Sequence, residues 1–470
     1  MLGGLLAWLD DRSGLITAGR HALEHPVPPR TGWWYVFGSA TLIAFILQVT
    51  TGIALSTAYV PSSGQAYESL KFISEQAMLG RFLRGMHYFG ASAMVLLIGI
   101  HVSRTYIMAA YKFPRELNWL TGAVLLLLTL ALAFTGQLLR WDQTAVWSVI
   151  VGAAQAARMP IVGEQIGRFI LAGDTIGGAT LTRFFAFHVF FIPAIVFAFI
   201  GLHLALVLRH GISERTRDGS VVDPATYRSH YASLLKREGV PFWPDAAWRD
   251  VVFGAAVTAT IVLLALIVGP PDLGPPPDPS ILEAYPRPDW YFLWYFALLA
   301  LAPNNLESLI IVLGPLVFGA ALLLVPVFNK GARTMRRRPW APLLVVFIWT
   351  TIGIFWIAGE RADWSPDFAA MPLPASVVRD QRPEVAQGAR LFHDKGCEFC
   401  HQVEGYGGRR GPDLSDVAAR MTPDQITARI TNGGPNMPAY VRTLTPVEVR
   451  SLMTLPPIPA PPCRSRAGSN

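Results

Sequence analysis

Long apolar stretches alternate with short polar connections up to about residue 360. Seven of these stretches are long enough, at 1.5 Å per helical residue, to cross the roughly 30 Å hydrocarbon core of a bilayer. The pattern predicts spans at about 33–57, 83–108, 117–138, 183–208, 250–268, 306–328 and 341–358. Because a helix satisfies its own backbone hydrogen bonds in lipid, we expect an all-α fold built around a transmembrane helical bundle.

Composition and charge fit a multi-pass membrane protein, with 52% hydrophobic and only 15% charged residues. The net charge of +7 lies mainly in the short connections, where it sets topology, so we expect no nucleic-acid binding. Eighteen Lys or Arg residues lie in 1–32, 102–118, 209–249 and 329–341, against five in 58–80, 139–181 and 269–289. The positive-inside rule therefore predicts a cytoplasmic N-terminus, and seven spans then put the C-terminus outside.

The polar segments divide the chain further. The N-terminal apolar stretch is too short, and too soon followed by Asp10 and Asp11, for a secretory signal peptide, so we expect a short surface helix. After residue 360 the composition becomes that of a soluble domain. The predicted parts are a cytoplasmic surface segment, a four-helix core, a three-helix part, a linker, a small all-α domain and a disordered tail, at 1–32, 33–212, 213–360, 361–383, 384–455 and 456–470.

Only four of the ten histidines fall inside predicted spans: His87 and His101 on the second, His188 and His203 on the fourth. Ionisable residues are costly in a membrane and indicate function. Fourteen residues are close to four helical turns, about 21 Å, and fifteen keep nearly the same face. Facing each other, the two helices would present two stacked bis-imidazole sites, as two low-spin b-type hemes require. The alternative is that these histidines only hydrogen-bond between helices.

Glycines on the neighbouring spans repeat this spacing. Gly38 and Gly52 lie on the first span and Gly122 and Gly136 on the third, each pair fourteen residues apart. A glycine lets a bulky planar group approach the backbone, although small residues also serve helix packing.

Three arginines flank the histidines. They are candidates for pairing with heme propionates, or they anchor the helices at the headgroups: Arg84, Arg104 and Arg183.

Several segments resemble the cytochrome b family, in order along about residues 20–358: RGMHYFGAS, HVSRTY, KFPREL, LTRFFAFH and PDWYF. The spacing of His188 and His203 and the WDQ at 141–143 resemble the plastid-type branch, whose last three spans form a separate subunit. Here the two parts are continuous. Val36 stands where that branch has a cysteine for an extra heme, which argues against such a heme. Arg140 stands where a proline is usual, and the sequence offers no account of it.

The outward loop carries a second feature of this resemblance. PRPDWYF at 286–292 is similar to the family's quinol-oxidation signature, with Asp289 in place of a glutamate. Quinol oxidation releases two protons, and a carboxylate can accept one of them. Tyr291 is a candidate partner of Asp289. The alternative is a Pro-Asp turn with aromatic residues anchored at the membrane interface.

A quinone-reduction site is expected near the His101/His203 pair on the cytoplasmic side. Its candidate residues are Arg209, His210 and Asp250, with Arg249 beside them. Positive-inside anchoring explains the arginines equally well.

The C-terminal domain carries CEFCH at 397–401. Cys397 and Cys400 can form thioether bonds to a c-type heme, and His401 can ligate its iron. Met437, 36 residues later, is the predicted sixth ligand, with Met421 as the competitor. Zinc or a redox dithiol is the alternative use of the cysteines, but no second Cys/His pair follows at finger spacing. The segments around this motif resemble a class I cytochrome c, whose heme is attached outside the cytoplasm.

Together the resemblances imply a subunit of a quinol:cytochrome c oxidoreductase in a bacterial cytoplasmic membrane. They imply a separate Rieske iron–sulfur protein, further cytochrome c carriers and a homodimeric complex as partners. The rival hypotheses are a heme-bearing membrane anchor that conducts electrons for another dehydrogenase, and a storage or sensor heme protein. The sequence leaves open which quinone is used, the final acceptor and the role of Cys463.

Overall fold

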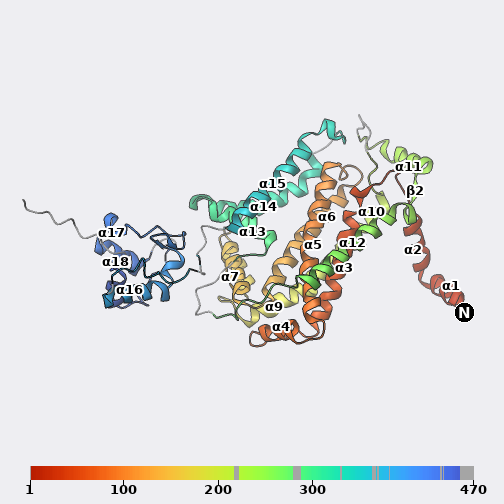
Figure 1. The fold of residues 1–470 in the computed structure, drawn as a ribbon. Coiled ribbons are helices and arrows are strands. Elements are labelled where there is room, and N and C mark those ends of the chain that lie inside the picture. The colour runs from red at the N-terminus through yellow and green to blue at the C-terminus, as the bar shows by residue number, and fades with distance from the viewer. Residues whose placement is uncertain are drawn as a thin grey trace, which may run out of the picture. The chain divides into compact units, whose positions relative to one another are not determined.

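The computed structural model describes residues 2–215, 222–278, 287–328, 331–361, 367, 370–380, 382–433, 437 and 439–455. The chain divides into two compact units, residues 1–356 and 357–470, which we describe separately. Helix dominates both units (Figure 1). In the described residues the strands form two short antiparallel pairs, β1 (Pro26–Val27) with β2 (Val240–Pro241) and β3 (Gln402–Val403) with β4 (Tyr406–Gly407). The all-α prediction is confirmed.

Four apolar helical segments form the first part of the bundle. α5 (Gly80–Ile107) packs along α3 (Phe37–Ser56), and α10 (Ile192–His210) packs along α6 (Glu116–Leu138) (Figure 1). The fourth segment is composite: α9 (Gly178–Ala186) and a π-helical turn, η2 (Phe187–Phe191), lead directly into α10. Its outward residues are apolar and exposed, as a lipid-facing surface requires.

The π-helical turn accounts for the unequal histidine spacing. His188 lies within η2, whereas α5 contains no such turn between His87 and His101. A π turn closes an i→i+5 hydrogen bond and so holds one residue more than an α turn. The fifteen-residue interval therefore covers the same number of turns as the fourteen-residue interval, and both histidine pairs keep one face.

The second part of the bundle contains four more helices. η3 (Phe242–Ala246) leads into α12 (Ala247–Ile267), which packs against α3 and α5. The apolar helix α13 (Trp290–Leu301) follows the proline-rich loop, ahead of α14 (Asn304–Phe328) and α15 (Trp340–Arg361). Among the described residues, seven segments are long and apolar enough to cross a bilayer, which agrees with the predicted number; α13 is too short to be one of them.

The connections hold shorter helices that the sequence reading left as loops or as a single surface helix. The N-terminal segment forms α1 (Leu2–Ser13) and α2 (Leu15–Glu24). The other connections contain α4 (Ala66–Glu75), α7 (Gln143–Ala157), α8 (Gly163–Leu171), α11 (Tyr227–Glu238), η1 (Trp33–Tyr35) and η4 (Met335–Arg337).

Buried polar side chains join the two parts of the bundle at the end that carries His101. Trp119 on α6 donates through Nε1 to the Leu322 carbonyl of α14 at 2.6 Å. Lys112 donates through Nζ to the Gly331 and Ala332 carbonyls at 3.1 and 2.8 Å. Arg338 donates to the Tyr111 hydroxyl and to carbonyls at the end of α5. These buried donors bind backbone carbonyls of the other part or of the end of α5, and so fix the second part against the first.

The C-terminal unit contains a small helical domain. α16 (Pro383–Asp394) packs on α19 (Pro446–Leu452). The chain between these two helices forms η5 (Cys397–Phe399), α17 (Val417–Arg420) and α18 (Pro423–Asn432). Its core includes Val385, Leu391, Phe392 and Leu452. Thr422 and Thr445 each close a capping box, which fixes where α18 and α19 begin.

Candidate heme and quinol sites

The first histidine pair joins α5 to the composite fourth segment. The rings of His87 and His188 lie 6.3 Å apart between centroids and nearly at right angles, with an interplanar angle of 76°. Both line a cavity of about 400 Å³, whose other walls come from α3, α6 and the loop before α13. The structure thus brings together the two side chains that the sequence pairs.

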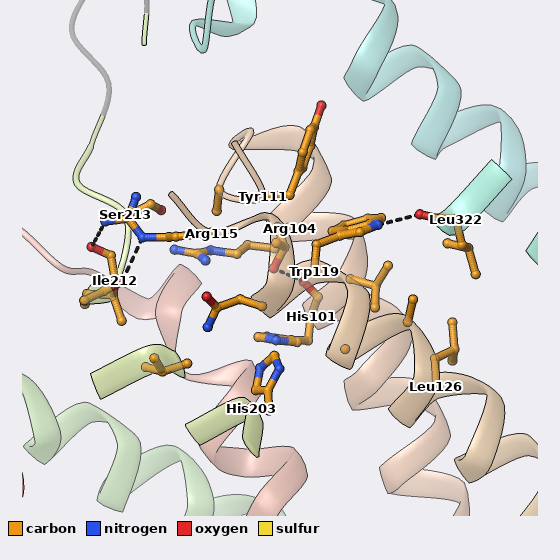
Figure 2. A pocket seen from close by; sticks show the side chains of 18 residues that line it. His101, Arg104, Tyr111, Arg115, Trp119, Leu126, His203, Ile212, Ser213 and Leu322 are labelled. Carbon is orange, nitrogen blue, oxygen red and sulfur yellow. Dashed lines mark hydrogen bonds between the residues drawn. The ribbon is translucent and has the colours of Figure 1, made fainter. Parts of the chain in front are cut away.

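The second pair, His101 and His203, lines another cavity at the opposite end of the same helices. Figure 2 shows their imidazoles next to each other, with the side chains of Arg104 and Arg115 above them in this view. The stacked arrangement expected from the spacing is therefore present in the fold.

All four predicted glycines face histidines. A Cβ added to Gly136 would lie 2.7 Å from Cε1 of His188, and one added to Gly52 would lie 3.2 Å from that atom of His87. The corresponding distances are 3.0 Å for Gly38 to His101 and 3.5 Å for Gly122 to His203. Each imidazole therefore stands against a backbone surface that has no side chain, and such a surface is what a planar macrocycle needs on its flank.

Threonines that the sequence reading missed orient three of the rings. The hydroxyls of Thr51, Thr121 and Thr135 lie 2.9, 2.8 and 3.1 Å from Nδ1 of His87, His203 and His188. Each hydroxyl already donates to a backbone carbonyl in its own helix, so it is free to accept the Nδ1 proton. Nε2 is then left as the ligating nitrogen. A signal was present, since each threonine directly precedes one of the glycines.

Two of the three predicted arginines line the histidine cavities. Arg84 is 8% exposed and donates to Ser74 Oγ at 3.0 Å and to the Pro271 carbonyl at 2.8 Å. Arg104 lies over the ring of Tyr35 at 3.9 Å, and its Nε and Nη2 are buried without a hydrogen-bond partner among the described residues. Buried unpaired donors of this kind suit an anionic group such as a propionate.

The third arginine, Arg183, is placed differently. It lines neither of the two cavities described here, donates to the Phe169 carbonyl and lies over the Phe169 ring.

Asp289 and Tyr291 lie in the same cavity as the first histidine pair. Asp289 is the residue before α13, and its Oδ2 accepts a hydrogen bond from the Tyr291 hydroxyl at 2.9 Å. Burial first, and then Asp289, raise the pKa of Tyr291 well above its usual value, so the phenol stays protonated and can donate. Trp290 fixes the start of α13 by donating to Ser92 Oγ on α5 at 3.1 Å.

The WDQ segment anchors the loop that leads towards α13. Asp142 caps α7 by accepting from the Ala145 amide at 2.8 Å, and its second oxygen accepts from the Gly274 amide at 3.2 Å. Gln143 exchanges two side-chain hydrogen bonds with the backbone of Asp278, at 2.7 and 3.0 Å. Residues 279–286 of this loop, including the start of the PRPDWYF motif, lie outside the described residues.

The residues predicted for quinone reduction do not line the cavity of the second histidine pair. Arg209 is exposed, His210 offers its carbonyl to Arg115 at 3.1 Å, and Asp250 accepts a hydrogen bond from Ser39. Arg115, which the sequence reading did not single out, lines this cavity together with Ser213. It is only 5% exposed and holds three consecutive carbonyls, those of 210–212.

In the C-terminal unit, the CEFCH segment forms the turn η5 after α16. His401 Nδ1 lies 2.8 Å from the Pro412 carbonyl, which leaves Nε2 available to a metal. A Cβ on Gly411 would lie 2.5 Å from the His401 ring, so this histidine also stands against bare backbone. Cys397 and Cys400 are partly buried, and burial raises the pKa of Cys397 to about 12.

The two methionines considered as sixth ligand are both described. Met437 is partly buried, and its neighbours 434–436 and 438 lie outside the described residues. Met421 ends α17 as its C-cap. Cys463 and the rest of the tail from residue 456 lie outside the described residues.

Three family models match the chain. Residues 22–211 match "Cytochrome b/b6/petB", residues 283–371 match "Cytochrome b(C-terminal)/b6/petD", and residues 383–454 match "Cytochrome C oxidase, cbb3-type, subunit III". The resemblance noted in the sequence is thus confirmed on both sides of residue 360.

Similar proteins extend this picture. The chain is 37% identical to "Menaquinol:cytochrome c reductase cytochrome b subunit" of Bacillus subtilis over 45% of its length and 99% of that protein. It is 30% identical to "Cytochrome b" of Allochromatium vinosum over 76% of its length and 87% of that protein. The solved structure "Hyperthermophilic respiratory Complex III" aligns with a TM-score of 0.64 and 25% identity, over 76% of this chain and 91% of that one.

Proposed function

Because this chain belongs to the cytochrome b family and carries a cytochrome c domain, we propose that it oxidises quinol as a subunit of a quinol:cytochrome c oxidoreductase. The observation that carries the proposal is one cavity that contains the His87/His188 pair and the Asp289–Tyr291 pair together. A heme ligated by the histidines would then lie beside a quinol held at the carboxylate. The similarity to the menaquinol:cytochrome c reductase subunit of Bacillus subtilis favours a naphthoquinol as the substrate.

Three hemes fit the side chains present. His87 with His188 and His101 with His203 would each hold a b-type heme, and the cysteines and His401 would hold a c-type heme with Met437 as sixth ligand. The fit rests on the four glycine surfaces, on the hydroxyls at Nδ1 and on the unpaired donors of Arg104. Val36 is buried and carries no thiol, so no further covalent heme is proposed there. Bound hemes supply one-electron redox chemistry and a path across the bilayer.

At the quinol, side chains of this chain would accept the protons that oxidation releases. Oxidation of one quinol yields one quinone, two electrons and two protons. The Asp289 carboxylate accepts a proton from a quinol hydroxyl, while the Tyr291 hydroxyl orients the carboxylate by donating to Oδ2. Hemes held by the two histidine pairs and by the CEFCH segment would take up the electrons one at a time, and a separate Rieske iron–sulfur protein would be the partner that links the quinol site to the cytochrome c domain.

The proposed sidedness follows from charge. Basic connections keep the N-terminus and 209–249 in the bacterial cytoplasm, so Asp289 and the cytochrome c domain face outside. Quinone reduction would take place near His101 and His203, where Arg115 and Ser213 line the cavity and the sequence-predicted Arg209, His210 and Asp250 do not. A homodimer and soluble cytochrome c acceptors complete the proposed assembly.

Replacing Asp289 by asparagine tests the function. The amide keeps the size and the hydrogen bond to Tyr291 but cannot accept the proton. We expect quinol:cytochrome c reductase activity of the purified complex to fall roughly 100-fold or more, with b and c heme spectra unchanged. Asp272→Asn, an exposed carboxylate on the same loop, is the matched control. Unchanged quinol oxidation in Asp289→Asn would favour the rival function, a heme-bearing anchor for another dehydrogenase.

A further inference from the structure

Arg140 occupies an unexpected place in the candidate quinol cavity. It lies in the turn between α6 and α7, and its side chain is 22% exposed. It lines the same cavity as His87, Asp289 and Tyr291. A cation in a cavity that is otherwise largely apolar is costly unless something in the cavity compensates its charge.

The nearest anion accounts for only part of that compensation. Arg140 Nε lies 3.7 Å from Oδ2 of Asp142, beyond hydrogen-bond distance, and this Nε is buried without a hydrogen-bond partner among the described residues. Asp142 is already held by the amides of Ala145 and Gly274. The helix cap and the loop anchor therefore do not require Arg140, and a donor of Arg140 is left over.

The other cation of the cavity is engaged elsewhere. Arg84 donates through Nη1 to Ser74 Oγ and through Nη2 to the Pro271 carbonyl. Besides Arg84 and His87, the titratable groups from α5, from α13 and from the residue before α13 that share the cavity with Arg140 are Tyr88, Tyr291 and Asp289. Arg140 acts electrostatically on Tyr291, whose pKa burial and Asp289 raise and Arg140 lowers. Arg140 is thus a cation of this cavity that acts electrostatically near Asp289 and Tyr291 and whose Nε has no hydrogen-bond partner among the described residues.

We propose that Arg140 binds the quinol oxygen that becomes negatively charged when the hydroxyl proton passes to Asp289. This deepens the proposed function and depends on it. In that step the O–H bond breaks, its electron pair stays on the quinol oxygen and the proton bonds to the carboxylate. A guanidinium aimed at this oxygen stabilises the ion more than the neutral quinol, and so promotes the step.

Arg140→Gln tests the proposal in the purified complex, assayed with a short-chain naphthoquinol and soluble cytochrome c between pH 5.5 and 8.5. Removing the cation raises the pKa of the quinol hydroxyl in its site, so the acidic limb of the kcat profile should move to higher pH. We expect kcat near pH 6 to fall at least tenfold, towards the roughly 100-fold typical of losing one donor to an oxyanion. Arg140→Lys, which keeps the charge, should restore most of the rate. Arg81→Gln, an exposed arginine beside Asp272, is the control.

The outcomes are distinct. An unchanged pH profile with a lowered midpoint potential of one b-type heme would overturn the proposal, because Arg140 would then pair with a propionate. An unchanged profile with only a lower Tm would also overturn it and leave a role in holding Asp142. If Arg140→Gln fails to assemble, Arg140→Pro takes its place, since the resembling family usually has proline at this position. If Asp289→Asn retains quinol oxidation, the proposed function is wrong. If Asp289→Asn loses activity but Arg140→Gln keeps the normal rate and pH profile, only the inference about Arg140 is wrong.

Discussion

At the residue scale, the same arrangement of a histidine ring against a glycine occurs four times. Each imidazole faces a glycine on the neighbouring helix, and three of the four are also held at Nδ1 by the threonine before that glycine. The fourth glycine, Gly38, follows Phe37, which has no hydroxyl. A side chain at a glycine and a flat ligand at its histidine would compete for the same space.

Gly136→Val is expected to remove one b-type heme. The new Cβ would lie within 2.7 Å of the His188 ring, and the two methyl groups would extend into the cavity that the first histidine pair lines. Pyridine hemochrome spectra of the purified variant should give one b-type heme per c-type heme instead of two. Gly201→Val on α10 is the matched control, because a Cβ there has nothing within 4 Å. Two b-type hemes with unaltered potentials in Gly136→Val would refute this role of the glycine.

Residue spacing made this part of the site predictable. The positions of His87, His101, Gly122 and Gly136 are periodic along single helices, and helical geometry turns such periods directly into faces. The threonines were also within reach of sequence reasoning. Arg140 was not, because its role depends on which cavity its side chain enters, and that is decided by how α6, α7 and α13 pack.

At the element scale, short irregular turns position the chemistry. η2 supplies the extra residue that keeps His188 in register, and the start of α13 sets Asp289 against Tyr291. η5 presents the two cysteines and packs at the core formed by α16 and α19. That packing has a consequence for heme attachment, because a thiol buried in a folded turn is a poor nucleophile.

Cys397 should react slowly in the folded, heme-free chain. Burial raises its pKa to about 12, so at pH 8 only about one thiol in ten thousand is ionised. Iodoacetamide labelling followed by mass spectrometry should therefore be at least roughly 100-fold faster after unfolding in guanidinium, where the pKa returns to about 8.5. In the folded chain the rate should rise about tenfold per pH unit between pH 7 and 10. Equal rates in folded and unfolded chains would contradict the burial argument, and would allow heme attachment after folding.

Contacts between elements far apart in sequence limited what could be predicted. Asp142 holds Gly274, and Arg115 holds the carbonyls of 210–212, across about a hundred residues or more. The sequence contained the WDQ segment and the basic connection, yet gave no indication of their partners. Long-range hydrogen bonds of this kind arise from packing rather than periodicity, so their residues read only as loop anchors or topology signals.

At the scale of the whole molecule, one chain carries cytochrome b segments that match two separate family models, followed by a cytochrome c domain. Buried cations at the end near His101 hold the two cytochrome b parts together: Lys112 and Arg338 are each no more than 6% exposed, and each bonds to the other part. The two cytochrome b parts are therefore joined both by the chain itself and by specific hydrogen bonds across their interface. It also ties the side of the cytochrome c domain to the number of spans that precede it.

The odd number of spans predicts opposite sides for the two ends of the chain. Alkaline phosphatase, which is active only outside the cytoplasm, should be active when fused after residue 360, because seven spans precede it. Fused after residue 239, at the end of α11, it should be inactive, because four spans precede it. The amounts of the two fusion proteins should be compared by immunoblotting, so that a difference in expression is not mistaken for a difference in location. Covalent heme is a second measure of the side on which the C-terminal domain lies, since attachment to Cys397 and Cys400 requires export of that domain. An active fusion after residue 239, or an inactive one after residue 360, would invert the proposed topology and place Asp289 in the cytoplasm.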